Sequence, residues 1–202
     1  MSEGRVRVVR TSTANLAAVR AAFRRLGHAV DVTDDPDLIA ESARVVLPGV
    51  GAFSAALDAV RSRGLHEAVE ARVRGERATL AVCLGLQLLA EGSEEAPGVS
   101  GLSILKGSAK RFDPSLGRVP HMGWNRIEAP GSADILRSGH GYFAHSYRLE
   151  EAPEGWTVAW SEYGGRFVAA VERGLVLACQ FHPELSGRYG AALLSGWLEA
   201  GT

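Results

Sequence analysis

The sequence has few cysteines, no long apolar run and no excess of either charge, and each shortage excludes a class of protein. Two cysteines among 202 residues are too few for a disulfide framework. No apolar run approaches the roughly 20 residues of a membrane-spanning helix. The 22 basic and 23 acidic side chains leave a net charge of −1. Nothing in this balance favours binding to nucleic acid or to an anionic membrane.

Signals for export and for metal binding are missing as well. The N-terminal residues run straight into a strand-like segment and lack the apolar core of a secretory signal peptide. Together with the low cysteine count, this predicts a reduced, cytoplasmic protein. The six histidines show no ligand spacing, and no Cys-x-x-Cys occurs. We therefore expect no metal and no other cofactor.

The composition and the hydrophobic pattern predict one α/β domain over residues 1–202. A chain of this size that is 46% hydrophobic can bury roughly 70% of its unfolded surface around one core. In the first half, short apolar runs alternate with helical patterns, which is typical of a parallel sheet covered by helices on both faces. In the second half, strand-like runs follow one another through short polar turns. We expect a doubly wound, mainly parallel sheet with an appended antiparallel section.

The boundaries of these elements follow from hydrophobic periodicity and from turn residues. The predicted strands are residues 6–9, 29–32, 45–47, 80–82, 142–149, 157–160, 167–171 and 175–181, and the predicted helices are residues 16–26, 53–60, 84–89 and 191–198.

Cys83 stands between a strand-like run and a helix-like run. This order is typical of a nucleophile elbow, a tight turn that favours small residues two positions to either side, here Ala81 and Gly85. Most free cysteines are buried small hydrophobes, and that reading competes here. The start of a helix, however, favours the reactive thiolate. Cys179 lies inside an apolar run, and we expect it in the core.

A second chemical motif, QFHPE at residues 180–184, ends another strand-like run. In extended backbone His182 and Glu184 project to the same side, and Pro183 keeps His182 extended. Taken alone, the motif also fits a surface turn. Combined with Cys83, it supplies a base and a carboxylate that orients the base, which are the parts of a nucleophilic triad.

The glycine-bearing stretch LPGVG at residues 47–51 lies between a predicted strand and a predicted helix. It is not a dinucleotide fingerprint, because Ser54 stands at the third glycine position and the loop does not follow the first strand. We predict that the Val50–Gly51 segment and the Leu84 amide form an oxyanion hole, with each donor contributing roughly 3–4 kcal/mol to transition-state stabilisation. A plain tight turn is the alternative.

The stretch VPHMGWN at residues 119–125 gathers aromatic, sulfur and amide groups in what we predict to be a short polar loop. Exposed methionine and tryptophan together often mark a binding surface. A core aromatic residue with a polar neighbour is the competing interpretation. A second aromatic-rich segment follows at residues 142–147.

At this point the chain resembles a known family, the triad-type (class I) glutamine amidotransferases, over essentially its whole length. Within that family it is most similar to the glutaminase subunits that serve histidine biosynthesis. The resemblance rests on LPGVG (47–51), CLGLQ (83–87), PHMGWN (120–125), YFAHSY (142–147) and QFHPE (180–184).

The resemblance implies a reaction and a set of residues. Cys83 would attack the side-chain amide of glutamine, and His182, held by Glu184, would protonate the leaving ammonia. Water would then hydrolyse the resulting thioester. The positions that hold glutamine in relatives correspond here to Gln87, Glu95, Ser146 and Tyr147.

The resemblance also implies a partner. Ammonia would pass into a cyclase subunit, a β/α barrel that forms a heterodimer with this chain. There it would give imidazole glycerol phosphate and an aminoimidazole carboxamide ribotide. The chain departs from its relatives at residues 11–15, where they usually carry an aromatic residue and two glycines before the asparagine. The residues expected on or near the docked face are Asn15, His121, Met122, Trp124 and Tyr142.

Two alternatives stay open. One is a glutaminase subunit for anthranilate, aminodeoxychorismate or pyridoxal phosphate synthesis, although Leu86 stands where anthranilate-type relatives usually carry histidine. The other is a non-catalytic, flavodoxin-like module whose cysteine senses oxidants. For the enzyme we expect low activity in isolation, because the donor of the glycine loop would be turned away until a liganded partner binds.

Overall fold

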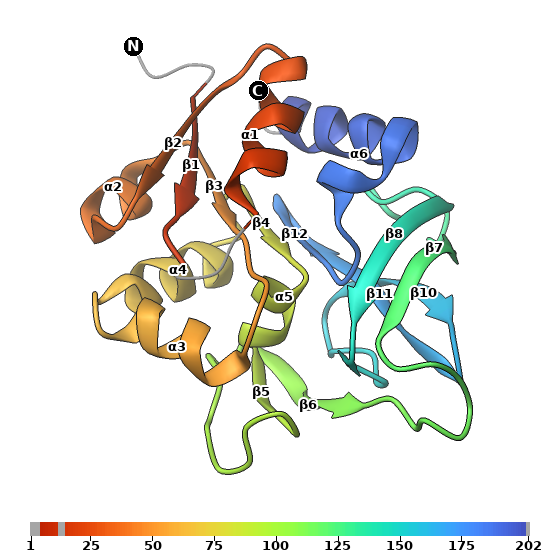
Figure 1. The fold of residues 1–202 in the computed structure, drawn as a ribbon. Coiled ribbons are helices and arrows are strands. Elements are labelled where there is room, and N and C mark those ends of the chain that lie inside the picture. The colour runs from red at the N-terminus through yellow and green to blue at the C-terminus, as the bar shows by residue number, and fades with distance from the viewer. Residues whose placement is uncertain (1–4, 12–14, 201–202) are drawn as a thin grey trace.

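The computed structural model describes residues 5–11 and 15–200 (Figure 1). Their central sheet contains β1 (Arg5–Val9), β2 (Ala29–Thr33), β3 (Arg44–Leu47), β4 (Thr79–Val82), β10 (Thr157–Glu162), β11 (Arg166–Arg173) and β12 (Val176–Cys179). The strand order is β10-β11-β12-β4-β3-β1-β2. Neighbours from β12 to β2 pair in parallel, and β11 and β10 extend the sheet antiparallel. The predicted parallel sheet with an antiparallel extension is confirmed.

Helices cover both faces of this sheet, as predicted (Figure 1). Helices α1 and α6 pack on one face, where the Phe23 and Trp197 rings meet edge to face with centroids 6.1 Å apart. Helices α2 to α5 pack on the other face. Their bounds are α1 (Leu16–Arg25), α2 (Pro36–Glu41), α3 (Phe53–Arg61), α4 (Leu65–Arg74), α5 (Leu84–Leu88) and α6 (Gly187–Glu199). No helix in the described part of the chain is long and apolar enough to cross a bilayer.

Two smaller sheets complete the described fold. Strands β5 (Ala90–Ser93), β6 (Leu105–Arg111) and β9 (Tyr147–Arg148) form one, and the antiparallel pair β7 (His121–Ile127) and β8 (Gly139–His145) forms the other. The prediction of a polar loop at residues 119–125 is therefore wrong. Most of that stretch is β7, because its backbone pairs with β8 along the whole strand, from His121 opposite His145 to Ile127 opposite Gly139.

Helices α2 and α4, which the sequence did not predict, are joined by the buried side chain of Arg72. Its guanidinium donates to carbonyl oxygens of Ile39, Ser42 and Ala78, and so connects α2 to the start of β3 and β4. Burial lowers the pKa of Arg72 to about 10, with a smaller contribution from Arg77, so the side chain stays charged at neutral pH. This network fixes α2 and α4 against the starts of β3 and β4.

Candidate active site

Cys83 occupies the turn between β4 and α5 in a conformation that side chains rarely adopt, with φ 51° and ψ −106°. The N–H of Cys83 donates to the carbonyl of Cys179 at 2.7 Å, which holds the turn against β12. A Cβ atom on Gly85 would lie 2.2 Å from the carbonyl oxygen of Leu47, so only glycine fits there. The predicted elbow geometry is confirmed, and strain of this kind is commonly found at functional sites. Cys179 is fully buried, as expected.

His182 and Glu184 stand beside this elbow because their strand is the neighbour of β4. Strands β12 and β4 run parallel, with Cys179 opposite Val82, so the residues that follow both strands meet at one edge of the sheet. His182 is extended, but residues from Pro183 onward form a 3₁₀ turn (Pro183–Leu185) rather than the expected extended backbone. The predicted pairing still forms, with 2.8 Å between His182 Nδ1 and Glu184 Oε1.

The electrostatics of His182 favour a protonated ring. Burial alone would lower its pKa, but hydrogen bonds with the side chains of Cys83 and Glu184 outweigh burial and raise the pKa to about 10. His182 is therefore paired with Glu184, and both Glu184 and Cys83 favour its charged form. An imidazolium between a sulfur and a carboxylate is the arrangement that stabilises a thiolate and can later give up a proton.

A pocket of about 200 Å³ opens over Cys83. It is bordered by every residue predicted to bind substrate or to form the oxyanion hole. The pocket also includes residues that the sequence did not single out for binding, because they approach only through the pairing of β7 with β8. The full lining is Val50, Gly51, Cys83, Leu84, Gln87, Glu95, Pro120, Met122, Ala144, His145, Ser146 and Tyr147.

Two of the predicted substrate residues are already held by the protein. Gln87 is buried, and its Nε2 atom donates both to the carbonyl of Tyr147 and to Oε1 of Gln180, each at 3.0 Å. Glu95 accepts a hydrogen bond of 3.0 Å from the backbone N–H of Phe53, the first residue of α3. Both side chains are therefore fixed in orientation at the pocket wall.

One of the two predicted oxyanion-hole donors, the Leu84 amide, is already hydrogen-bonded to the glycine loop. The N–H of Leu84 donates to the carbonyl oxygen of Gly49 at 3.3 Å. The loop packs closely there, since a Cβ atom on Gly49 would lie 2.7 Å from the Cβ atom of Leu84 and 2.9 Å from the nitrogen of Gly85. An oxyanion at this position would have to replace the Gly49 carbonyl, which requires the Gly49–Val50 peptide to rotate.

The residues predicted for a docking face do not all point the same way. Met122 and Trp124 are 64% and 57% exposed on β7. The Tyr142 ring lies edge to face with Trp124, at 6.2 Å between centroids. His121, in contrast, alternates inward and is buried against His145 and aromatic rings. Asn15 is exposed and caps α1, accepting from the N–H of Ala18. Of the divergent segment 11–15, residues 12–14 lie outside the described residues.

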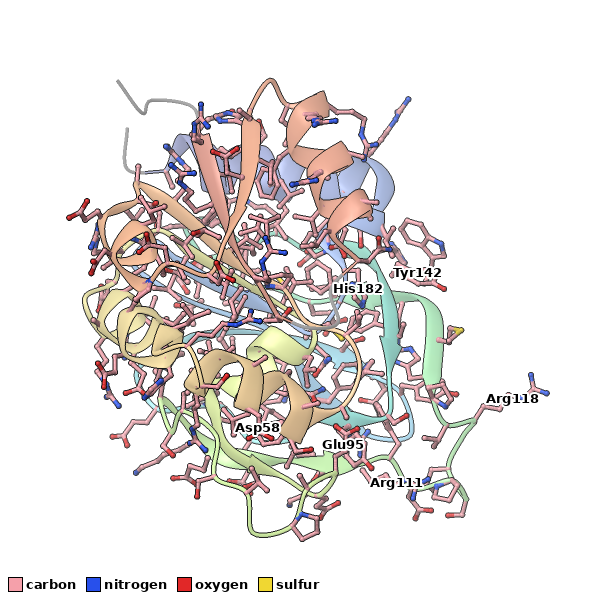
Figure 2. The ribbon with its side chains drawn as sticks, turned by 60° about the vertical axis from the view of Figure 1, so that its left-hand side comes forward. Asp58, Glu95, Arg111, Arg118, Tyr142 and His182 are labelled. Carbon is pink, nitrogen blue, oxygen red and sulfur yellow. The ribbon has the colours of Figure 1, made fainter. Side chains whose placement is uncertain are left out.

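The β7–β8 face and the histidine are structurally joined. Tyr142 forms an isolated bridge with His182, whose N–H donates to the Tyr142 carbonyl at 2.8 Å (Figure 2). The buried hydroxyl of Ser186 ties the same two segments, donating to the His182 carbonyl and accepting from the N–H of Tyr142. Among the described residues, no group of three or more His, Cys, Asp or Glu side chains is arranged to hold a metal ion.

Comparison with known proteins agrees with this geometry. The family model for class-I glutamine amidotransferases matches residues 10–198. The subunit HisH of imidazole glycerol phosphate synthase from Moorella thermoacetica is 40% identical over 92% of this chain and 90% of its own length. The subunit HisH from Escherichia coli strain K12 is 39% identical over 95% and 97%. A crystal structure of a glutamine amidotransferase superposes with a TM-score of 0.77 at 26% identity, covering 98% of this chain and 99% of that one.

A longer relative contains the same region as one part. The chloroplastic imidazole glycerol phosphate synthase hisHF of Arabidopsis thaliana is 40% identical over 91% of this chain, which spans 32% of that protein.

The fold, the elbow at Cys83 and the family match define the class: the chain is a class I glutamine amidotransferase. Since the chain covers 90% and 97% of the two HisH subunits, the subunit is defined as well. The chain belongs to the HisH family, the glutaminase subunits of imidazole glycerol phosphate synthase in histidine biosynthesis.

Proposed function

We propose that the described site hydrolyses glutamine at Cys83 and passes the ammonia to a cyclase subunit docked over the β7–β8 face. One observation carries this proposal: a strained cysteine at a strand-to-helix turn shares one edge of the sheet with the His182–Glu184 pair, beside a pocket of about 200 Å³. We assign the reaction to one domain over residues 1–202, acting in the cytoplasm, where thiols stay reduced.

The roles follow from the positions of the three side chains. The Cys83 thiolate attacks the side-chain carbonyl carbon of glutamine, and the carbonyl oxygen becomes an oxyanion. The carbon–nitrogen bond then breaks while protonated His182 gives its proton to the leaving nitrogen, which departs as ammonia. A glutamyl thioester remains on Cys83. Water attacks that thioester as His182 accepts its proton, and glutamate leaves as the thiolate is restored. Glu184 holds the imidazole throughout.

Substrate would be held by the pocket wall. Gln87 and Glu95 are fixed in orientation by their hydrogen bonds, so they present polar groups to a bound amino acid without losing side-chain entropy on binding. Ser146 and Tyr147 border the same pocket from the segment that follows β8. We propose these four residues as the glutamine site.

The oxyanion hole is proposed to form only when the glycine loop turns. In the present arrangement the Gly49 carbonyl accepts from the N–H of Leu84. Rotating the Gly49–Val50 peptide would remove that oxygen and point the Val50 N–H into the pocket, which gives two donors in place of none. Loss of one such donor typically costs a hundredfold to a thousandfold in turnover. The isolated subunit should therefore be slow until its partner biases the loop.

The partner is proposed to be a β/α-barrel cyclase in a heterodimer with this chain. Met122 supports the placement, because it is exposed on β7 and also borders the pocket over Cys83. A barrel docked on that face would thus receive ammonia close to where it is released. Trp124 and Tyr142 supply an aromatic anchor of the kind that is enriched at the centre of interfaces. Asn15 is proposed at the rim.

The test is glutamate release by this chain with the cyclase subunit and its nucleotide ligand, compared with the chain alone. We expect turnover to rise at least a hundredfold in the liganded complex and to vanish in Cys83→Ala. Activation by an anthranilate or aminodeoxychorismate synthase subunit instead would reassign the partner. Glutaminase activity that survives Cys83→Ala would end the proposal.

A further inference from the structure

Gln180 is a fully buried side chain that the mechanism above does not use. It follows the last residue of β12, and its backbone N–H donates to the Ala169 carbonyl at 2.8 Å. Its side-chain amide lies between the amide of Gln87 and the sulfur of Cys83, with 3.0 Å from Oε1 to Gln87 Nε2 and 3.6 Å from Nε2 to Cys83 Sγ. Both contacts are buried.

The orientation of this amide is fixed by a chain of hydrogen bonds that starts at the backbone. The carbonyl of Tyr147 can only accept, so the Gln87 atom 3.0 Å from it must be the nitrogen. The same nitrogen contacts Gln180, so the Gln180 atom facing it must be the oxygen. The remaining amide atom of Gln180, which faces Cys83, is therefore the N–H donor.

The first link of this chain is itself restrained. The Tyr147 carbonyl also lies 2.8 Å from Nδ1 of His145, a buried ring whose other nitrogen contacts His121 at 3.0 Å. Because the carbonyl is held from two sides, Gln87 and then Gln180 have one hydrogen-bonded arrangement available. A flipped Gln180 amide would place two N–H donors against each other at the Gln87 end and an oxygen against the sulfur at the other end.

We propose that Gln180 is a further catalytic residue of the glutaminase: its N–H donates to the Cys83 sulfur and stabilises the thiolate. This inference rests on the proposed role of Cys83 as nucleophile. His182 also approaches the sulfur, but it must release its proton during the reaction. The amide of Gln180 cannot give up its proton at neutral pH, so it can stabilise the sulfur both before attack and when the thiolate is restored. A hydrogen bond to a charged group at a buried position is among the stronger ones available to a protein.

Two substitutions separate the effect of losing the Gln180 N–H donor from the effect of altered packing. Gln180→Met fills a similar volume without any donor. Gln180→Glu keeps the shape and an oxygen facing Gln87, and replaces the donor toward the sulfur with a second oxygen. Ser161→Ala is the control, because it removes a different buried polar group of the central sheet, a hydroxyl that has no hydrogen-bond partner among the described residues. A Cys179→Ala background leaves Cys83 as the one thiol of the chain.

The readouts are steady-state glutaminase kinetics of the complex with the cyclase subunit, and the rate of Cys83 alkylation by iodoacetamide as a function of pH. The titratable groups around the sulfur are His182, backed by Glu184, and the pocket-wall residues His145, Glu95 and Tyr147. These are unchanged in both variants. We expect kcat to fall about ten- to a hundredfold with KM changed less than about threefold. The pH of half-maximal alkylation should rise by about one unit. Ser161→Ala should match the parent in both measurements.

The results separate the role of Gln180 from the proposed function of the site. Folded Gln180→Met and Gln180→Glu proteins with the parent's kcat and alkylation profile would overturn the role of Gln180. A drop in kcat with an unchanged alkylation profile would also overturn it, since a merely structural defect leaves the thiol chemistry alone. If Cys83→Ala remains active, the proposed function fails first. An inactive Cys83→Ala beside fully active Gln180 variants removes only the present inference.

Discussion

His121 Nδ1 lies 3.0 Å from His145 Nε2, and both rings are buried. Nδ1 of His145 carries a proton, because it lies 2.8 Å from the Tyr147 carbonyl, which can only accept. The Nε2 atom of His145 therefore accepts, and His121 donates to it from Nδ1. The pair is neutral, and a proton added to His145 would remove this hydrogen bond.

This pair makes the protein sensitive to acid. Burial lowers the pKa of His121 to about 4 and that of His145 to about 3. Between about pH 6.5 and pH 4, His121 and His145 are protonated in the unfolded chain but stay neutral in the folded protein. The free energy of unfolding therefore falls as the pH falls through this range. Urea unfolding midpoints should drop across that range. His121→Gln should flatten the slope, and the exposed His140→Gln should leave it unchanged. Equal slopes in all three proteins would contradict the assignment.

Glu184 sets the charge and the tautomer of His182. Replacing it with glutamine keeps the shape but removes the negative charge 2.8 Å from Nδ1. We expect Glu184→Gln to lower kcat by about two to four orders of magnitude. The His182 pKa should fall, because one of the two hydrogen bonds that raise it to about 10 loses its charge. Titration of the imidazole resonance by NMR measures this shift, and an unmoved midpoint would show that Glu184 does not act on the ring.

Gly85 is predicted to be irreplaceable for steric reasons. An added Cβ atom would lie 2.2 Å from the Leu47 carbonyl oxygen, so α5 and β3 would have to separate. We expect Gly85→Ala to lower the free energy of unfolding by about 3 kcal/mol. Gly196 in α6 has nothing within 4 Å of its added Cβ atom, and Gly196→Ala should raise stability by about 0.5–1 kcal/mol. Thermal unfolding of the two variants should shift in opposite directions, and a shared direction would argue against the steric account.

Arg72 is predicted to hold the α2–α4 layer together. Arg72→Met would remove a buried donor from the carbonyls of Ile39, Ser42 and Ala78, although Arg77 still contacts Ser42 and the Val45 N–H still donates to Ala78. We expect a loss of about 3 kcal/mol or more in the free energy of unfolding. Arg77 contacts some of the same carbonyls from an exposed position, so Arg77→Met should cost less than about 1 kcal/mol. Similar losses in both variants would show that the buried position contributes nothing extra.

The sequence predicted best where chemistry and local geometry coincide. The elbow at Cys83 could be read because a strand, a cysteine and a helix with small neighbours are contiguous in the chain. The meeting of Cys83 with His182 could be inferred because parallel strands end at one edge. The parallel order with its antiparallel extension followed from the change in hydrophobic pattern along the chain.

What the sequence concealed depends on pairing between distant segments. Strand β7 was read as a loop because its glycine, polar and aromatic residues have no alternating pattern, and only the partner β8 makes it a strand. The inward turn of His121 is a consequence of that same pairing. The contact of Gln180 with the Cys83 sulfur could not be inferred either, because it depends on which way two amides face, and a carbonyl of Tyr147 decides that.

The backbone bond between the Cys83 amide and the Cys179 carbonyl has a consequence for regulation. It joins the ends of two paired strands of the central sheet, one followed by the nucleophile and the other by the base, so a docked protein has little effect on their separation. In the proposed mechanism, the part that moves is instead the Gly49–Val50 peptide of the adjacent glycine loop. Under the proposed mechanism, the inactive and active states differ in the direction of the Gly49 carbonyl. Such a subunit would keep its triad assembled without hydrolysing glutamine until the partner binds.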